Sequence, residues 1–290
     1  MRVLVTGGRG FLGRRLMHFL AGHEVLSLVR SLSREEPAPN VRNVVGDLAG
    51  DGAWQQEVEA FAPDWCIHLA WDGLPDYSLE RCRHNLDANV GLMQTLVRAR
   101  VRRVVVAGTC WEYGRVTGSM HEDAVPLDCG VFATTKHAIR TMLDGVARDA
   151  GFEYRWARIF FVYGPGQRSV ALIPHVRASL LAGNMPSLRE PNAIQDYVHV
   201  DDVARGLLSL AACDAPSGVF NLGSGQPTSV GEIANRVAEH YGRARPFAHV
   251  ESGDGFWADG SRTLAAVGWR PDIGIADGIA MTLRELDGAS

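Results

Sequence analysis

The chain has 290 residues, with 29 Lys and Arg against 33 Asp and Glu, so its formal net charge is -4. Hydrophobic residues make up 46% and charged residues 21% of the sequence. This composition is typical of soluble globular proteins and excludes disordered, collagenous and coiled-coil classes. The slight acidic excess argues against a nucleic-acid partner, and the length suggests about two domains or one large domain with a smaller cap.

The chain shows no sequence signal for a membrane or a metal ion. No apolar run is long enough to span a bilayer, and no signal peptide is recognisable at the start, so we expect a cytoplasmic protein without a membrane partner. Five cysteines are widely spaced, without a CxxC pair or metal-ligand spacing to histidines. We therefore expect reduced thiols and no metal site.

Short β-branched segments alternate with longer segments of helical period in the first half of the chain. Strands are expected at residues 3–5, 24–29, 41–45, 65–69, 103–107 and 155–160. Helices are expected at residues 11–20, 79–99 and 132–149. This alternation predicts an α/β fold with a parallel sheet. Further on, the pattern predicts a helix at 170–182, a loop at 183–195, a helix at 201–212, a strand at 219–222 and a helix at 230–241.

A glycine-rich turn follows the first expected strand. Gly8, Gly10 and Gly13 form a GxGxxG motif between that strand and an amphipathic segment. Residues without a Cβ let backbone N–H groups at a helix N-terminus approach a pyrophosphate, which is how dinucleotides are bound. We therefore expect a Rossmann-type doubly wound parallel sheet.

The end of the second expected strand indicates which dinucleotide is bound. An acidic residue at this place usually binds the ribose 2′-hydroxyl of NAD. Here the chain has Arg30, followed by Arg34, and a guanidinium can pair with a 2′-phosphate. The sequence therefore predicts NADP(H), with NAD(H) as the alternative.

The regular alternation weakens after residue 164, which suggests two functional regions. We expect residues 1–164 to form the dinucleotide-binding Rossmann domain, and we expect the chain to return to this domain near residues 195–222. Residues 165–290 are expected to form mainly a smaller C-terminal substrate-binding region.

Several segments together resemble the extended short-chain dehydrogenase/reductase superfamily, in its NAD(P)-dependent epimerase/dehydratase group acting on nucleotide sugars. They lie at residues 6–13, 46–48, 67–71, 107–114, 156–167, 195–204 and 220–234, together with the helix that carries Lys136. Within the group, the segments 67–71, 107–114 and 156–165 look most like sugar 4-ketoreductases related to CDP-abequose synthase.

The resemblance implies roles for residues at matching positions. Implied cofactor-binding residues are Gly7, Gly8, Gly10, Phe11, Leu12, Gly13, Arg30, Asp47, Leu48, Leu69, Ala70, Trp71 and Lys136. Implied catalytic positions are Thr109, Phe132 and Lys136. Implied substrate-binding residues are Trp71, Cys110, Trp111, Arg168, Gln195 and Arg245. For Asp47, ordinary turn chemistry is an alternative explanation.

Phe132 is the largest departure from the family pattern. The family motif YxxxK has a tyrosine at this position, one helical turn before Lys136, as the proton donor or acceptor. An engineered substitution, a natural enzyme whose acid lies elsewhere and a protein that has lost catalysis all remain open. Substitute acids in the second case are Tyr77, Glu112, His121 and Cys110.

The leading functional hypothesis is an NADP(H)-dependent 4-ketoreductase of a deoxyhexose linked to a nucleotide. A 4,6-dehydratase is disfavoured, because Cys110 and Trp111 occupy the places of the Asp-Glu pair of family dehydratases. Alternatives are an epimerase or isomerase that uses the cofactor transiently or as a scaffold, and a catalytically silent dinucleotide-binding protein. The resemblance also implies a homodimer through the helices at 79–99 and 132–149.

Overall fold

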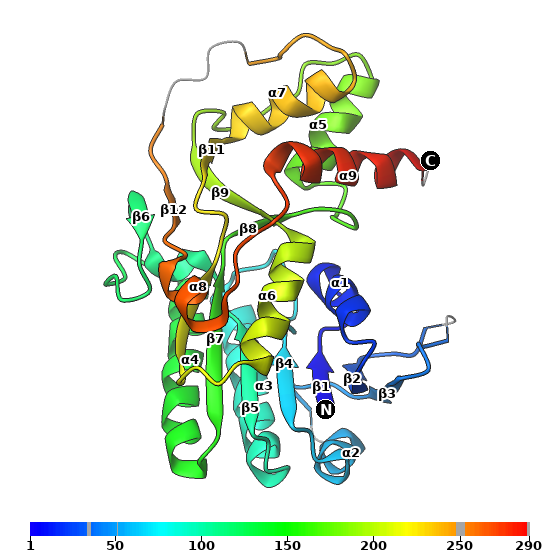
Figure 1. Ribbon diagram of the computed structural model, residues 1–290, viewed down its shortest axis with the longest axis vertical. Coiled ribbons are helices and arrows are strands. Elements are labelled where there is room, and N and C mark those ends of the chain that lie inside the picture. Colours follow the sequence, from blue (N-terminus) through cyan, green and yellow to red (C-terminus); the bar gives the residue numbers. More distant parts are fainter. Residues whose placement is uncertain (34–35, 51, 248–252, 289–290) are drawn as a thin grey trace. The chain divides into compact units, whose positions relative to one another are not determined.

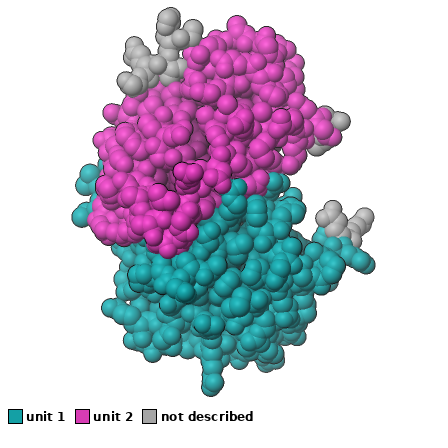
Figure 2. Space-filling model, viewed as in Figure 1, with its two compact units in different colours: residues 1–115, 125–158, 204–220 teal, residues 116–124, 159–203, 221–290 magenta. Residues whose placement is uncertain are grey.

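The computed structural model describes residues 1–33, 36–50, 52–247 and 253–288 (Figure 1). The chain forms two compact units (Figure 2). Unit 1 consists of Met1–Arg115, Val125–Arg158 and Ala204–Phe220, and unit 2 of Val116–Ala124, Ile159–Val203 and Asn221–Ser290. Within the described ranges, no helix is both long and apolar enough to cross a membrane.

The larger sheet has seven strands in the order β10-β7-β5-β4-β1-β2-β3. These strands are β1 (Arg2–Thr6), β2 (Glu24–Val29), β3 (Val41–Val45), β4 (Trp65–His68), β5 (Arg103–Ala107), β7 (Glu153–Ile159) and β10 (Gly218–Leu222). All pairs from β7 to β3 are parallel. The expected α/β fold with a Rossmann-type parallel sheet is therefore confirmed.

Both faces of this sheet are buried, as a parallel sheet requires. Leu4 and Cys66 belong to a core cluster that includes residues of three helices. These helices are α2 (Ala53–Phe61), α3 (Leu79–Arg98) and α4 (Val131–Ala150). Val5 and Ile67 alternate with Leu4 and Cys66 along their strands, so they point to the opposite face, and they are also fully buried. The helix α1 (Phe11–Phe19) follows β1 directly.

Unit 2 contains two small sheets. In one, β8 (Phe161–Tyr163), β9 (Ile194–His199) and β11 (Pro227–Ser229) have the order β11-β9-β8. In the other, β6 (Gly118–Met120) pairs with β12 (Phe256–Ala258). The helices of this unit are α5 (Leu172–Leu181), α7 (Val230–His240), α8 (Ser261–Val267) and α9 (Ile275–Gly288). The helix α6 (Val200–Ala212) begins in unit 2, and its residues from Ala204 onwards belong to unit 1. An apolar cluster that includes Val176, Ile233, Val237 and Leu283 joins α5, α7 and α9.

The strand expected at 155–160 corresponds to β7, which ends one residue earlier, and a further strand, β8, begins at Phe161. β7 ends at Ile159, and Phe161 already pairs with Tyr197 of β9 in another sheet. Phe160 lies between them and donates its N–H to the carbonyl of Leu222 at 3.1 Å. The sequence analysis did not predict β8, because the uninterrupted apolar run from Ile159 to Tyr163 carries no mark of a change of sheet. The loop expected at 183–195 is also too long, since β9 begins at Ile194.

Gly13 on α1 provides a test of the packing between α1 and the turn before it. A Cβ on this residue would lie 2.2 Å from the carbonyl oxygen of Gly7 and 2.7 Å from the Cα of Gly8. We expect Gly13→Ala to lower the free energy of unfolding by about 1–3 kcal/mol, measured by urea denaturation. In the control Gly22→Ala, a Cβ meets nothing within 4 Å, so the change should stay within about 0.5 kcal/mol. Equal losses in both variants would contradict the packing argument.

Candidate functional site

The turn between β1 and α1 has the shape that a pyrophosphate cradle requires. Gly7 has φ +74, and a Cβ on it would lie 2.8 Å from the backbone nitrogen of Ala70. Gly10 caps α1 without a side-chain hydrogen bond and donates its own N–H to the carbonyl of Gly7 at 2.9 Å. The first N–H groups of α1 therefore depend on solvent or a ligand, and an anion suits them. These residues fit a nicotinamide dinucleotide.

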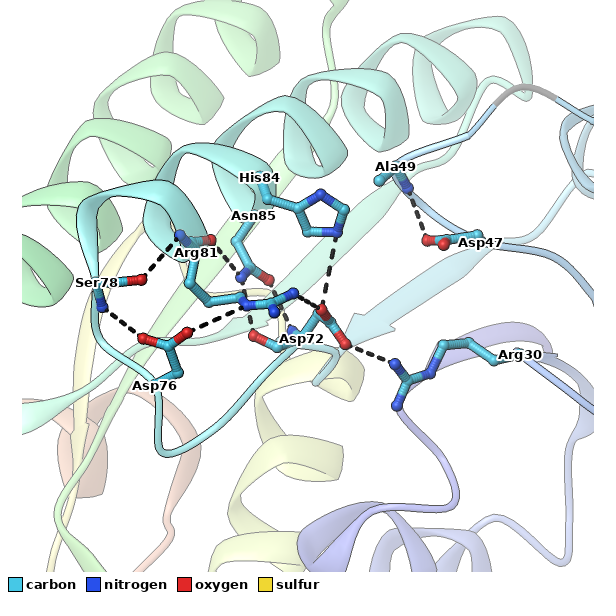
Figure 3. A network of polar contacts seen from close by, with 9 residues as sticks. All are labelled: Arg30, Asp47, Ala49, Asp72, Asp76, Ser78, Arg81, His84 and Asn85. Atoms are coloured by element: carbon cyan, nitrogen blue, oxygen red, sulfur yellow. Dashed lines mark hydrogen bonds and ion pairs between the residues drawn. The ribbon is translucent and has the colours of Figure 1, made fainter.

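The other residues expected near the dinucleotide lie at the ends of neighbouring strands. Leu69 and Ala70 follow β4 directly and lie against Gly7, as described above. Phe11 and Leu12 form the first turn of α1. Asp47 follows β3, and its carboxylate accepts the N–H of Ala49 at 3.0 Å, so it stabilises its own turn (Figure 3). Leu48 packs against the core of the sheet.

Thr109 is held at the end of β5 by hydrogen bonds within its own turn. It caps the short 3-10 helix η1 (Cys110–Tyr113), and its hydroxyl accepts the N–H of Trp111 at 3.3 Å. Its own N–H donates to Oε1 of Glu112 at 2.9 Å. Gly108 must lack a side chain here, because a Cβ would lie 2.2 Å from Nε1 of Trp156.

Glu112 is the buried anchor of this turn. Its side chain is 0% exposed and that of Arg158 is 3% exposed, with 3.1 Å between Oε2 and Nε. Trp156 donates its indole N–H to the same carboxylate at 2.8 Å and 3.0 Å. All of these contacts commit the carboxylate to structure, so the structure argues against Glu112 as the substitute acid.

Lys136 on α4 contacts the end of β5, two residues before Thr109. Its Nζ donates to the carbonyl of Ala107 at 2.9 Å and lies 4.3 Å from the ring centroid of Trp71. Burial lowers the pKa of the Lys136 ammonium to about 8, while the charge of Glu112 opposes this shift. The ammonium is therefore a stronger acid than that of an ordinary lysine.

Phe132 lies one helical turn before Lys136, in a cluster of aromatic rings. Its ring centroid is 5.0 Å from that of Trp71, 4.9 Å from that of Tyr77 and 5.8 Å from that of Trp111. Trp111 is 40% exposed and Tyr77 is 38% exposed, whereas Cys110 is buried. The structure thus brings Thr109, Lys136 and the aromatic cluster of Trp71, Tyr77, Trp111 and Phe132 together in unit 1.

His68 is a site residue that the sequence analysis missed. It is buried at the end of β4, where its Nδ1 is 2.6 Å from the hydroxyl of Thr6 and its Nε2 is 3.1 Å from Oδ1 of Asn89. Burial and, to a smaller extent, the charge of Lys136 together lower the pKa of His68 to about 3. A neutral imidazole therefore links β1, β4 and α3 beneath the site. Only its strand-end position could have marked it in the sequence.

The remaining expected substrate residues belong to unit 2. Gln195 lines a pocket of about 330 Å³, together with Tyr197 and Gln167. Oη of Tyr197 and Oε1 of Gln167 are buried and have no hydrogen-bond partner in the described part of the chain. Arg168 is exposed near the start of α5. Arg245 pairs with Glu232 and lies 3.5 Å from Glu239, so its charge is already balanced by carboxylates.

Two acidic residues of unit 2 have structural partners. Asp196, next to Gln195, is fully buried and accepts hydrogen bonds from Ser224, Gly225 and Ala258 at 2.5–2.9 Å. Asp202, in the first turn of α6, accepts the N–H groups of residues 272 and 273 at 3.1 Å and 3.0 Å. Their carboxylates therefore fix loops of this unit.

Glu112→Gln tests the structural role of the buried pair. The variant leaves the Arg158 guanidinium buried without its counter-charge, so the free energy of unfolding should fall by about 3–5 kcal/mol in urea denaturation. The pKa of Lys136 should fall below about 8, because the charge that raises it is removed. Glu57→Gln is the control, since its ion pair with Arg42 is half exposed, and it should cost less than about 1 kcal/mol. A loss as small as that of the control would disprove the anchoring role of Glu112.

Comparisons with known proteins agree with this geometry. A model of the NAD dependent epimerase/dehydratase family matches residues 3–223. A dTDP-L-rhamnose 4-epimerase of Burkholderia thailandensis is 27% identical, and the match covers 96% of this chain and 93% of the relative. A probable dTDP-glucose 4,6-dehydratase of Sinorhizobium fredii is 25% identical, covering 98% and 92% respectively. The structure of MoeE5 in complex with UDP-glucuronic acid and NAD superposes with a TM-score of 0.86, at 29% identity and with 100% of both chains covered. The chain therefore belongs to the NAD-dependent epimerase/dehydratase family of enzymes.

Proposed function

We propose that this enzyme transfers hydride between a nicotinamide dinucleotide and C4 of a hexose linked to a nucleotide diphosphate. The proposal rests on one observation. Thr109, Lys136 and the aromatic cluster lie together in the unit that contains the glycine turn. When bound, the nicotinamide would donate or accept the hydride. Thr109 would hold the oxygen on C4, and Lys136 would orient the nicotinamide ribose. The relatives named above support C4, since one is a 4-epimerase.

Reduction of a 4-ketone is the direction that the side chains favour. A 4-epimerase that starts from an alcohol needs a base to remove the hydroxyl proton, and Phe132 cannot do so. A reductase needs only a proton for the alkoxide that hydride addition creates. The Lys136 ammonium, with a pKa of about 8, can supply such a proton from Nζ. Epimerisation is the second candidate, because the similarity to the dTDP-L-rhamnose 4-epimerase supports it.

We propose that unit 2 binds the nucleotide part of the substrate. The pocket beside Gln195 has apolar walls from Phe161, Leu172 and Ile173. Among the described residues, three that line it have buried polar atoms without hydrogen-bond partners, namely Tyr163, Gln167 and Tyr197. Such a mixture suits a flat, polar-edged base. Arg168 is the exposed cation nearest in sequence to this pocket and is proposed for the diphosphate. The cofactor is expected to be NADP(H), because of Arg30, with NAD(H) also accepted.

Phe132→Tyr is the test of this function. The added hydroxyl would lie one helical turn from the Lys136 ammonium, which lowers the pKa of a phenol. We expect NADPH oxidation with a 4-keto-6-deoxy nucleotide sugar to rise by at least about a hundredfold, measured spectrophotometrically. The assay needs CDP-, dTDP-, GDP- and UDP-linked sugars, since the nucleotide is unknown.

Phe132→Leu is the matched control, because it keeps an apolar side chain without adding an acid, and its activity should not rise. Product formation without net NADPH consumption would instead support the epimerase. A folded Phe132→Tyr protein that binds NADPH and a 4-keto sugar but oxidises no cofactor would disprove the reductase and favour a catalytically silent binding protein.

We also propose a homodimer through α3 and α4. These helices expose Leu79, Val97, Val131 and Met142, which are 72%, 38%, 46% and 41% exposed. A contact between two copies would cover these apolar side chains. In analytical ultracentrifugation at micromolar concentration we expect a dimer that Met142→Glu converts to a monomer. Leu264→Glu on α8, where Leu264 is 49% exposed, is the control and should stay dimeric. A monomeric wild-type protein would end this proposal.

A further inference from the structure

Asp72 is fixed in the segment between β4 and α3 by several contacts (Figure 3). Its N–H donates to Oδ1 of Asn85 at 2.8 Å, and its carbonyl accepts from Nδ2 of Asn85 at 3.0 Å. Its carboxylate accepts a hydrogen bond from Arg81 and lies 3.8 Å from Nε2 of His84. All three partners lie on α3, so this helix determines where the carboxylate lies.

Arg30 reaches the same carboxylate from the opposite side of the cofactor turn. It follows β2, and its Nη1 lies 2.5 Å from Oδ1 of Asp72. In the sheet, β2 and β4 flank β1, so this pair joins the segments that follow the two strands on either side of β1. Neighbouring strands lie about 4.8 Å apart, so the two flanking strands are about 10 Å apart, a distance that an arginine and an aspartate together can span.

The two partners differ in how firmly they are held. The Arg30 side chain is 76% exposed, whereas that of Asp72 is 29% exposed. Asp72 is bonded on both its backbone and its carboxylate, and for Arg30 the only described side-chain bond is the one to Asp72. The position of the Arg30 guanidinium is therefore imposed by Asp72.

We propose that Asp72 determines cofactor selectivity by holding Arg30 and so weakening the preference for NADP(H) over NAD(H). The inference rests on the proposed function, because it assumes that a dinucleotide binds at the glycine turn. In dinucleotide-binding folds, the residue at the end of the second strand contacts the ribose 2′ position of the cofactor. A 2′-phosphate must compete with the Asp72 carboxylate for Arg30, whereas a 2′-hydroxyl does not need this guanidinium. Asp72 thus makes NAD(H) usable in a chain that has arginine where NAD enzymes have an acidic residue.

Asp72→Asn is the direct test, with dissociation constants for NADP and NAD measured by titration calorimetry. The ratio of the NAD constant to the NADP constant should rise about fivefold over wild type, mainly through tighter NADP binding, which corresponds to about 1 kcal/mol for an exposed ion pair. Asp72→Ser should give the same direction, and it serves if the asparagine variant does not fold.

Asp76→Asn is the matched control. Asp76 lies 3.7 Å from Arg81 in the same network but makes no described contact with Arg30, so the ratio should stay within about twofold of wild type. In an Arg30→Ala background, Asp72→Asn should also change the ratio by less than about twofold, because no guanidinium is left for Asp72 to hold.

Each other outcome overturns the inference. An unchanged ratio in Asp72→Asn, in a protein that still binds both dinucleotides, would overturn the selectivity role and leave the proposed function intact. If the ratio rises equally in the Arg30→Ala background, Asp72 repels the 2′-phosphate directly. That result would overturn the inference that Asp72 acts by holding Arg30. A wild-type protein that binds neither dinucleotide would overturn both the inference and the proposed function.

Discussion

The buried ion pair of Glu112 and Arg158 is the constraint on which the candidate site depends. Two charges removed from water are tolerated only when further hydrogen bonds satisfy them. Trp156 and the N–H of Thr109 supply those bonds. The carboxylate cannot move without losing all these partners at once, so the end of β5 is fixed. This fixed end presents both the Thr109 hydroxyl and the Ala107 carbonyl that receives Lys136.

The parallel sheet explains why residues far apart in sequence share this site. The carboxyl ends of β1, β4 and β5 meet at one edge, so the turns after them are neighbours. Gly7 can approach Ala70 closely only because it lacks a side chain. His68 lies between Thr6 and Asn89 and stays neutral, since an imidazolium would add a buried charge near Lys136. A neutral His68 therefore adds no further positive charge beside the buried Lys136 ammonium.

The sequence predicted local features well and long-range partners poorly. The glycine turn and the alternation of strands and helices are visible because each is a short pattern with a regular spacing. Lys136 was predicted from the family resemblance. The pairing of Arg30 with Asp72 joins residues 42 positions apart, and that of Glu112 with Arg158 joins residues 46 apart. No local pattern marks either pair, so Arg30 was read as free for a phosphate and Glu112 as a substitute acid. Arg34, expected to assist Arg30, lies outside the described residues.

Phe132 has a role in this site even though it lacks a hydroxyl. Its ring packs edge-on against Trp71, whose ring lies 4.3 Å from Nζ of Lys136, and removal of water from the ammonium is the main cause of the lowered pKa of Lys136. At pH 7, about one unit below that pKa, roughly nine-tenths of the ammonium groups remain protonated. The site therefore keeps its positive charge while making the proton easier to release. A group in this state can donate a proton to an alkoxide but is poorly suited to removing one from an alcohol, and this difference is the chemical basis of the reduction proposed above.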